Sequence, residues 1–264
     1  IQGITELLPV SSTAHMRIVP ALLGWPDPGS AFSAAMQLAA LAAVVSYFWR
    51  DVREVVTGSI GAVQRRDFSN QSFKLAVAIV LATIPIGIAG LALSSTLNAC
   101  DSPLRGLMVI GISCVVMAVL LAAAELSCRH RRTVGEMRLR DALIVGIAQV
   151  GALIPGVSRS GSTLTAALFL NFKREEAARF SFLLGLPAIA LAGLKELWVL
   201  FHAHIPAEAW SHLIFGLVIA SVSAFCAIWG LMKFLEKFST WPFVIYRAAL
   251  GIFLIVAVST GFLS

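Results

Sequence analysis

Four polar residues near the start of the sequence are of types that together can activate a hydroxyl group. Gln2 and Glu6 are four positions apart and would share one face of a helix. Ser12 and His15 are three positions apart and would do the same. A hydroxyl beside an imidazole, with a carboxylate near, is a common arrangement for nucleophilic catalysis.

Each of these residues also has a structural explanation. Gln2 can hydrogen-bond between helices, and Glu6 can pair with a buried cation. Ser12 could serve simply as a helix N-cap, and the hydrogen-bonding capacity of His15 could be satisfied by a backbone carbonyl. The functional interpretation therefore rests on the four residues occurring together.

A second stretch, residues 154–163, places one arginine in a polar break between two apolar runs and reads IPGVSRSGST. An arginine at mid-bilayer costs about 2.5 to 3.5 kcal/mol on insertion scales, so Arg159 indicates the binding of an anion. Pro155 would end one helix, and Ser158 or Ser160 could cap the next and direct backbone N–H groups at a phosphate. The alternative is a proline kink in which the arginine pairs with a carboxylate.

The composition places these residues in a membrane protein. Of the 264 residues, 58% are hydrophobic and 13% are charged, which leaves no segment for a soluble domain. The net charge of +6 comes from residues in short links between apolar runs, so we expect no nucleic-acid partner. The four cysteines are scattered singly, which argues against a disulfide framework or a cysteine metal site.

We therefore expect an all-α polytopic membrane protein, a single domain over residues 1–264, with six transmembrane helices of about 20 residues each. Two broken apolar segments, 1–24 and 139–171, are expected to be re-entrant helical hairpins. Because the chain starts at Ile1 inside an apolar pattern, we expect residues upstream. The expected spans are Ser30 to Trp49, Phe73 to Leu93, Leu104 to Leu126, Glu176 to Leu200 (bent at Pro187), Trp210 to Leu231 and Trp241 to Phe262.

Charge in the links predicts the orientation. Basic residues gather after the first and third spans, directly after the second hairpin and after the fifth span, so these links are expected in the cytoplasm and the first hairpin is expected to enter from outside. The residues concerned are Arg50, Arg53, Arg65, Arg66, Lys74, Arg129, Arg131, Arg132, Arg138, Arg140, Lys173, Arg174, Lys233 and Lys237.

The two halves resemble each other. Leu8-Pro9-Val10-Ser11-Ser12-Thr13 matches residues 154–160, and each motif is followed some residues later by Phe-Ser, at Phe32 and at Phe180. One hairpin and three spans then occur twice, over 1–126 and 139–264. Because the first copy is expected to begin outside and the second inside, the two would be inverted repeats. This arrangement brings broken-helix tips together near the midplane.

The motif from Gln2 to His15, together with Pro155-Gly156-Val157-Ser158-Arg159-Ser160-x-x-Thr163, resembles the bacitracin-resistance type of undecaprenyl-diphosphate phosphatase. The resemblance covers essentially the whole chain. It implies an inner-membrane enzyme with its site open to the periplasm. Such an enzyme removes one phosphate from undecaprenyl diphosphate, recycles the lipid carrier for cell-wall synthesis and gives bacitracin resistance. It also implies a divalent cation, Mg²⁺ or Ca²⁺. Membrane lipids are expected partners, and a homodimer is left open.

The resemblance also implies roles for single residues. Glu6 would be a metal ligand or base, Ser12 the nucleophile and His15 its proton partner, with attack by His15 left open. Arg159 would clamp the diphosphate. Gln2 stands where many members have Glu, which weakens its role as a second metal ligand, and Ala14 stands where many have Gly. The residues expected to line the phosphates are Ser11, Thr13, Ser158, Ser160 and Thr163.

Two other classes compete with the enzyme. Inverted repeats with broken helices are typical of secondary transporters, and a lipid-carrier flippase could use the same midplane site. A transporter needs no nucleophile, so the pairing of Ser12 with His15 favours the enzyme. A structural scaffold would not carry this many polar groups inside the membrane.

Overall fold

The computed structural model describes residues 1–25, 35–93, 106–202 and 207–263, and it confirms the all-α class. Within these ranges no strand forms beyond an isolated bridge between Arg132 and Phe172. Five of the described helices are long and apolar enough to cross a membrane, and they correspond to five of the six predicted spans. They are α6 (Gln71–Ala92), α8 (Leu107–Ser127), α11 (Arg174–His202), α12 (Ala207–Leu235) and α13 (Trp241–Ser259).

The first predicted span, Ser30 to Trp49, differs from the structure. Residues 30–34 lie outside the described residues, and the apolar helix α4 covers only Gln37–Tyr47 before the backbone turns at Phe48. A second helix, α5 (Trp49–Arg65), follows where the sequence predicted a link. Polar and apolar residues alternate along α5 with a helical period, so a search for long apolar runs does not detect it.

Both predicted hairpins form. The first consists of α1 (Gln2–Thr5), a turn and α2 (Ser12–Leu23). The second consists of α9 (Leu139–Val150), a 3-10 turn and α10 (Arg159–Phe169). Their re-entrant position in a bilayer stays a prediction.

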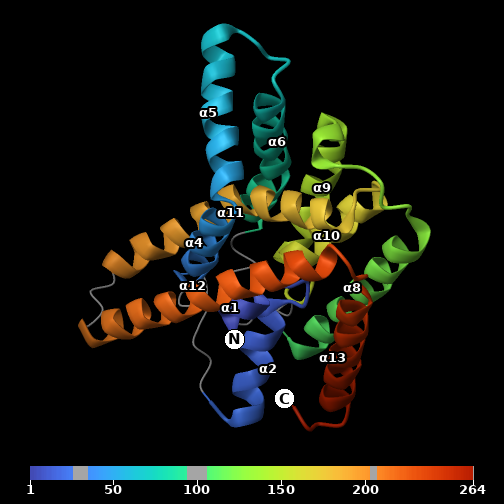
Figure 1. Cartoon of the computed structure of the whole chain (residues 1–264). Coiled ribbons are helices and arrows are strands. Elements are labelled where there is room, and N and C mark those ends of the chain that lie inside the picture. Colours follow the sequence, from blue (N-terminus) through green and yellow to red (C-terminus); the bar gives the residue numbers. More distant parts are fainter. Residues whose placement is uncertain (26–34, 94–105, 203–206, 264) are drawn as a thin grey trace.

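Each hairpin packs against a helix of the opposite half of the chain. Helix α1 contacts α12 and helix α9 contacts α6, while α8 packs against α13 (Figure 1). The two hairpin contacts match in detail: a Cβ on Gly3 would lie 2.4 Å from Ala220 O, and a Cβ on Gly146 would lie 2.3 Å from Ala82 O. An inverted repeat predicts that each hairpin contacts a helix of the other half in the same way. The division at 1–126 and 139–264 stays a prediction that the matched contacts support.

Some basic residues that the sequence assigned to orientation also hold helix ends together. The guanidinium of Arg132 donates to Leu170 O at 3.0 Å and pairs with Asp141 at 2.5 Å. The guanidinium of Arg174, at the start of α11, forms an ion pair with Glu125 near the end of α8. These contacts join the connection after α8 to the second hairpin, and the end of α8 to α11.

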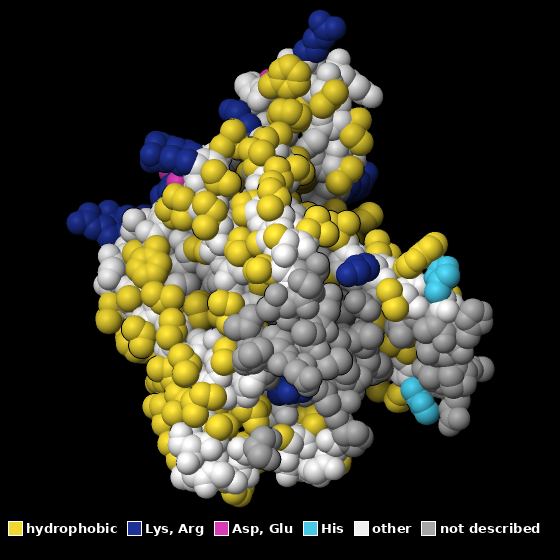
Figure 2. Space-filling view, turned by 180° about the vertical axis from the view of Figure 1, so that it is seen from behind, with side chains coloured by type: hydrophobic (Ala, Val, Ile, Leu, Met, Phe, Trp, Pro, Cys, Tyr) yellow, Lys and Arg dark blue, Asp and Glu magenta, His cyan; other side chains and the backbone are white. Residues whose placement is uncertain are grey.

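The outer surface is largely apolar, as expected for a protein in contact with lipid. Figure 2 shows hydrophobic side chains spread over the described part of one face, with most of its Lys and Arg side chains towards the top and one edge. Exposed residues such as Ile88, Leu91, Val119 and Phe215 belong to the spanning helices. The five apolar helices and this surface make the chain a multi-pass membrane protein.

Close packing at Gly146 yields a first prediction. Gly146→Ala should lower the free energy of unfolding by about 1 to 3 kcal/mol, because the new Cβ overlaps the α6 backbone at Ala82. Gly87→Ala is the matched control, since nothing lies within 4 Å of a Cβ there, and it should be neutral or slightly stabilising. Thermal unfolding of both variants in detergent checks this, and equal stability of the two would contradict the close contact.

Candidate active site

Two serine-capped helix starts form the centre of the site. Ser11 caps α2 and accepts a hydrogen bond from Ala14 N, and Ser158 caps α10 and accepts one from Gly161 N. Both serines have positive φ, 71° and 70°. Such backbone conformations cost about 1 to 3 kcal/mol and gather at functional sites. The two turns therefore share one local structure, and each directs a helix N-terminus towards the site.

One carboxylate joins the two hairpins. Ser12 Oγ donates to Glu6 Oε2 at 2.6 Å, and Arg159 Nη2 donates to Glu6 Oε1 at 3.0 Å. The Glu6 side chain is 8% exposed and that of Arg159 is 16% exposed. The structure thus brings three of the four predicted catalytic residues into direct contact, although two of them are separated from Arg159 by about 150 residues of chain.

His15 lies on the same helix as Ser12 and makes other contacts. Its Nδ1 is 2.7 Å from Ser11 O, and its Nε2 is 2.5 Å from the hydroxyl of Tyr246. Because a carbonyl only accepts, Nδ1 carries the proton and a neutral His15 accepts the Tyr246 hydroxyl at Nε2. The Ser12 hydroxyl donates to Glu6 rather than to His15. The role of His15 as proton partner stays a prediction.

The hydroxyl residues predicted to line the phosphates lie around these contacts. Ser158 Oγ and Ser160 Oγ are 3.1 Å apart, and Ser160 Oγ donates to Leu8 O in the first hairpin at 3.1 Å. Thr163 Oγ1 donates to Arg159 O at 2.8 Å, within its own helix. Thr13 is exposed, whereas Ser11 is fully buried. Phosphate contacts of these five residues stay predictions.

Arg247 on α13 is a residue that sequence reasoning missed. It is 1% exposed, and its guanidinium donates to Pro9 O at 3.1 Å, to Gly156 O at 2.8 Å and to Val157 O at 2.9 Å. One cation therefore holds the backbone of both turns just before their capping serines. The insertion cost that singled out Arg159 applies equally to Arg247, so the signal was present in the apolar run from residue 241 to 262.

Gln149 was also missed. The sequence Gly146-Ile147-Ala148-Gln149 repeats the pattern of Gly3-Ile4-Thr5-Glu6, and both glycines make the helix contacts described above. Gln149 is fully buried, and its two amide atoms have no hydrogen-bond partner in the part of the chain that the structure describes. Comparison of the two hairpins, rather than of the two proline motifs alone, would have found it.

Metal ligands are few at this site. Across residues 1–25, 35–93, 106–202 and 207–263, no three His, Cys, Asp or Glu side chains come close enough to hold a metal ion. Glu6 is the carboxylate of the site, and Gln2 is buried one helical turn before it. Mg²⁺ is commonly held by one or two carboxylates together with substrate phosphates, so this donor set fits a cation that is bound mainly by a diphosphate.

Comparisons with known proteins identify the family of the chain. The family model described as bacitracin resistance protein BacA matches residues 1–253. Undecaprenyl-diphosphatase 2 of Mesorhizobium japonicum is 71% identical over 264 residues, covering 100% of both chains. The undecaprenyl-diphosphatase of Gloeobacter violaceus is 50% identical over 100% of this chain and 90% of its own. That of a Synechocystis species is 50% identical over 99% and 81%.

The position of Arg247 yields a second prediction. Arg247→Lys keeps the charge but replaces a fork of donors by one ammonium, so at least one turn should lose its donor. A buried carbonyl left unpaired costs about 1 to 3 kcal/mol, which should lower the melting temperature by several degrees. The control is Arg140→Lys, whose side chain is 73% exposed. If both variants melt like the parent, Arg247 does not hold the turns.

Proposed function

Because the chain belongs to the family of the bacitracin resistance protein BacA, we propose that it is an undecaprenyl-diphosphatase, which converts undecaprenyl diphosphate to undecaprenyl phosphate and inorganic phosphate. The product would return to cell-wall synthesis as carrier lipid, and this recycling would give resistance to bacitracin. The observation that carries the proposal is the contact of Ser12 and Arg159 with the same carboxylate, Glu6.

These contacts support a phosphoryl transfer to Ser12. Glu6 Oε2, 2.6 Å from Ser12 Oγ, takes the hydroxyl proton while Oγ bonds to the terminal phosphorus. The bond from that phosphorus to the bridging oxygen breaks, and undecaprenyl phosphate leaves. Water then attacks the phosphoserine, releases inorganic phosphate and restores the Ser12 hydroxyl. Such transition states spread negative charge over the equatorial oxygens, so positioning and charge stabilisation supply most of the catalysis.

Arg159 and the two helix starts supply that stabilisation. A guanidinium can bind two phosphate oxygens at once, which an ammonium cannot. The N-termini of α2 and α10 add backbone N–H groups and the positive ends of their helix dipoles. His15, held by Ser11 O and Tyr246, lies one turn from Ser12 and, as a neutral imidazole, can orient the attacking water and take its proton.

A divalent cation is part of the proposal. Glu6 would hold it, with the side-chain oxygen of Gln2 as a further ligand. Bound there, the cation would neutralise charge on the phosphate oxygens. A set with one carboxylate fits Mg²⁺ better than Ca²⁺, because Ca²⁺ usually takes six to eight oxygen ligands.

The inner membrane and a site that faces the periplasm complete the proposal. The charge bias of the links places the first hairpin on the outside, so the diphosphate would enter from the outer leaflet. A flippase or secondary transporter remains the competing function for paired hairpins. The hydrogen bond from Ser12 to Glu6 favours the enzyme, because transport needs no activated hydroxyl.

Purified protein should therefore release inorganic phosphate from undecaprenyl diphosphate. Ser12→Ala should lower the rate by several orders of magnitude, whereas Ser46→Ala, a serine of α4, should leave it within about twofold. Exhaustive chelation should abolish the activity, and added Mg²⁺ should restore it. No phosphate release by the parent would refute the proposed function. Full activity after chelation would refute only the cation.

The orientation has its own test. In a background without the four native cysteines, Trp25→Cys should react with a membrane-impermeant thiol reagent added to intact cells. Gln64→Cys, near the end of α5, should not react until the cells are permeabilised. Trp25 is 61% exposed in the structure and Gln64 is exposed as well. Burial within the protein therefore does not limit the reaction at either position. The opposite labelling pattern would place the first hairpin on the cytoplasmic side and contradict a periplasmic site.

A further inference from the structure

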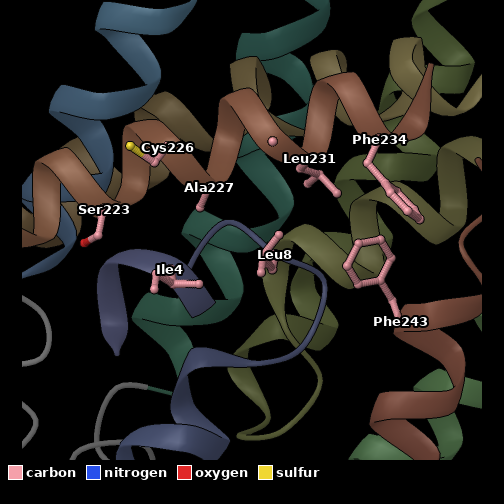
Figure 3. A pocket seen from close by; sticks show the side chains of 9 residues that line it. Ile4, Leu8, Ser223, Cys226, Ala227, Leu231, Phe234 and Phe243 are labelled. Carbon is pink, nitrogen blue, oxygen red and sulfur yellow. The ribbon is translucent and has the colours of Figure 1, made fainter. Parts of the chain in front are cut away.

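An apolar groove runs along α12 beside the first hairpin, and we call it the α12 groove. Its cavity volume is about 600 Å³, within the range of about 300 to 1,000 Å³ that is typical of ligand sites. Figure 3 shows α12 side chains on one side, Ile4 and Leu8 of the first hairpin on the other, and two aromatic rings at one end. Its lining includes Ile4, Leu8, Cys226, Gly230, Phe234 and Phe243.

The lining favours a ligand without polar groups. The hydroxyl of Ser223 in the groove is satisfied within its own helix, because it donates to Ile219 O at 2.8 Å. The rings of Phe234 and Phe243 meet edge to face at 5.8 Å between centroids and close one end with hydrocarbon. A Cβ on Gly230 would touch nothing within 4 Å, so the backbone of α12 is bare at this point. This surface suits a long hydrocarbon chain.

The groove adjoins the candidate active site at Leu8. Leu8 lines the groove with its side chain, while its carbonyl accepts the Ser160 hydroxyl at 3.1 Å. Leu8 follows Glu6 by two residues and precedes Pro9, whose carbonyl is held by Arg247. The turn that carries the carboxylate therefore also forms a wall of the groove. A hydrocarbon chain attached to a diphosphate bound at Glu6 and Arg159 would start beside this wall.

We propose that the α12 groove binds the prenyl chain of the substrate next to its diphosphate. The inference rests on the proposed function for the identity of the chain. A second cavity of about 270 Å³ lies between α4 and α12, but it includes Ser46 and Ser221 and no hairpin residue, so it lacks the link to the site. Ordinary phospholipid is the competing occupant of the α12 groove, and the experiment below separates the two.

Cys226 is an exposed free cysteine that lines the α12 groove and also the second cavity, so it reports on lipid bound to this side of α12, and Gly230, which lines the groove and not the second cavity, separates the two in the kinetic test. In the full-length protein with Cys100→Ser and Cys128→Ser, the other remaining cysteine, Cys114, is buried. Alkylation of Cys226 by N-ethylmaleimide, followed by mass spectrometry, should slow several-fold when undecaprenyl phosphate is added. This lipid has the prenyl chain but no diphosphate bond to hydrolyse. Inorganic diphosphate and dioleoylphosphatidylglycerol should leave the rate unchanged.

Each other result overturns the assignment. Equal protection by the phospholipid makes the groove a general lipid contact, and protection by inorganic diphosphate means that Cys226 reports on the phosphate site. No protection by undecaprenyl phosphate places the chain elsewhere. Because this assay needs no turnover, it can fail while phosphate release succeeds, and it can succeed while phosphate release fails.

A kinetic test uses the open space at Gly230. Gly230→Leu should place a side chain in the groove, since a Cβ there meets nothing within 4 Å, and should lower kcat/KM for undecaprenyl diphosphate by about tenfold, mainly through KM. Gly87→Leu on α6 is the matched control, since a Cβ there also meets nothing within 4 Å, and it should stay within twofold of the parent. Equal kinetics for both variants, with normal melting temperatures, would exclude the groove as the binding site of the chain.

Discussion

The candidate site depends on the pairing of two charges that are expensive to bury alone. A carboxylate or guanidinium removed from water must be compensated, and breaking such a pair costs about 3 to 5 kcal/mol. Glu6 and Arg159 compensate each other at 3.0 Å, and the remaining Glu6 oxygen accepts the Ser12 hydroxyl. Because the partners come from different hairpins, this pair ties the two halves of the chain together at the site.

The surrounding structure supports that pair from three sides. Arg247 holds the backbone of both turns, the two capping serines set the helix starts, and each hairpin is pressed against a helix of the other half at a glycine. Rigid placement of this kind is what phosphoryl transfer requires, since its catalysis comes mainly from positioning. Strained backbone at Ser11 and Ser158 is tolerated because these contacts over-determine it.

Much of this could be predicted from local pattern, and the rest depended on tertiary contacts. Apolar runs predicted six spanning helices, five of which are present among the described residues, and proline with serine predicted the starts of α2 and α10. Amphipathic α5 was missed because its signal is periodic rather than apolar. A cation partner for Glu6 was considered, yet spacing along one helix favoured Ser12 with His15. Spacing cannot show that Tyr246, some 230 residues away, binds His15.

Double-mutant kinetics test the central claim, that Glu6 and Arg159 act as one unit across the hairpins. kcat/KM for undecaprenyl diphosphate would be measured for the parent, Glu6→Gln, Arg159→Lys and the double variant, with folding checked by melting temperature. Residues in contact show coupling of about 0.5 to 3 kcal/mol, so the double variant should lose far less than the product of the two single losses. Strictly multiplicative losses would contradict the account, because they would mean that the two side chains act independently.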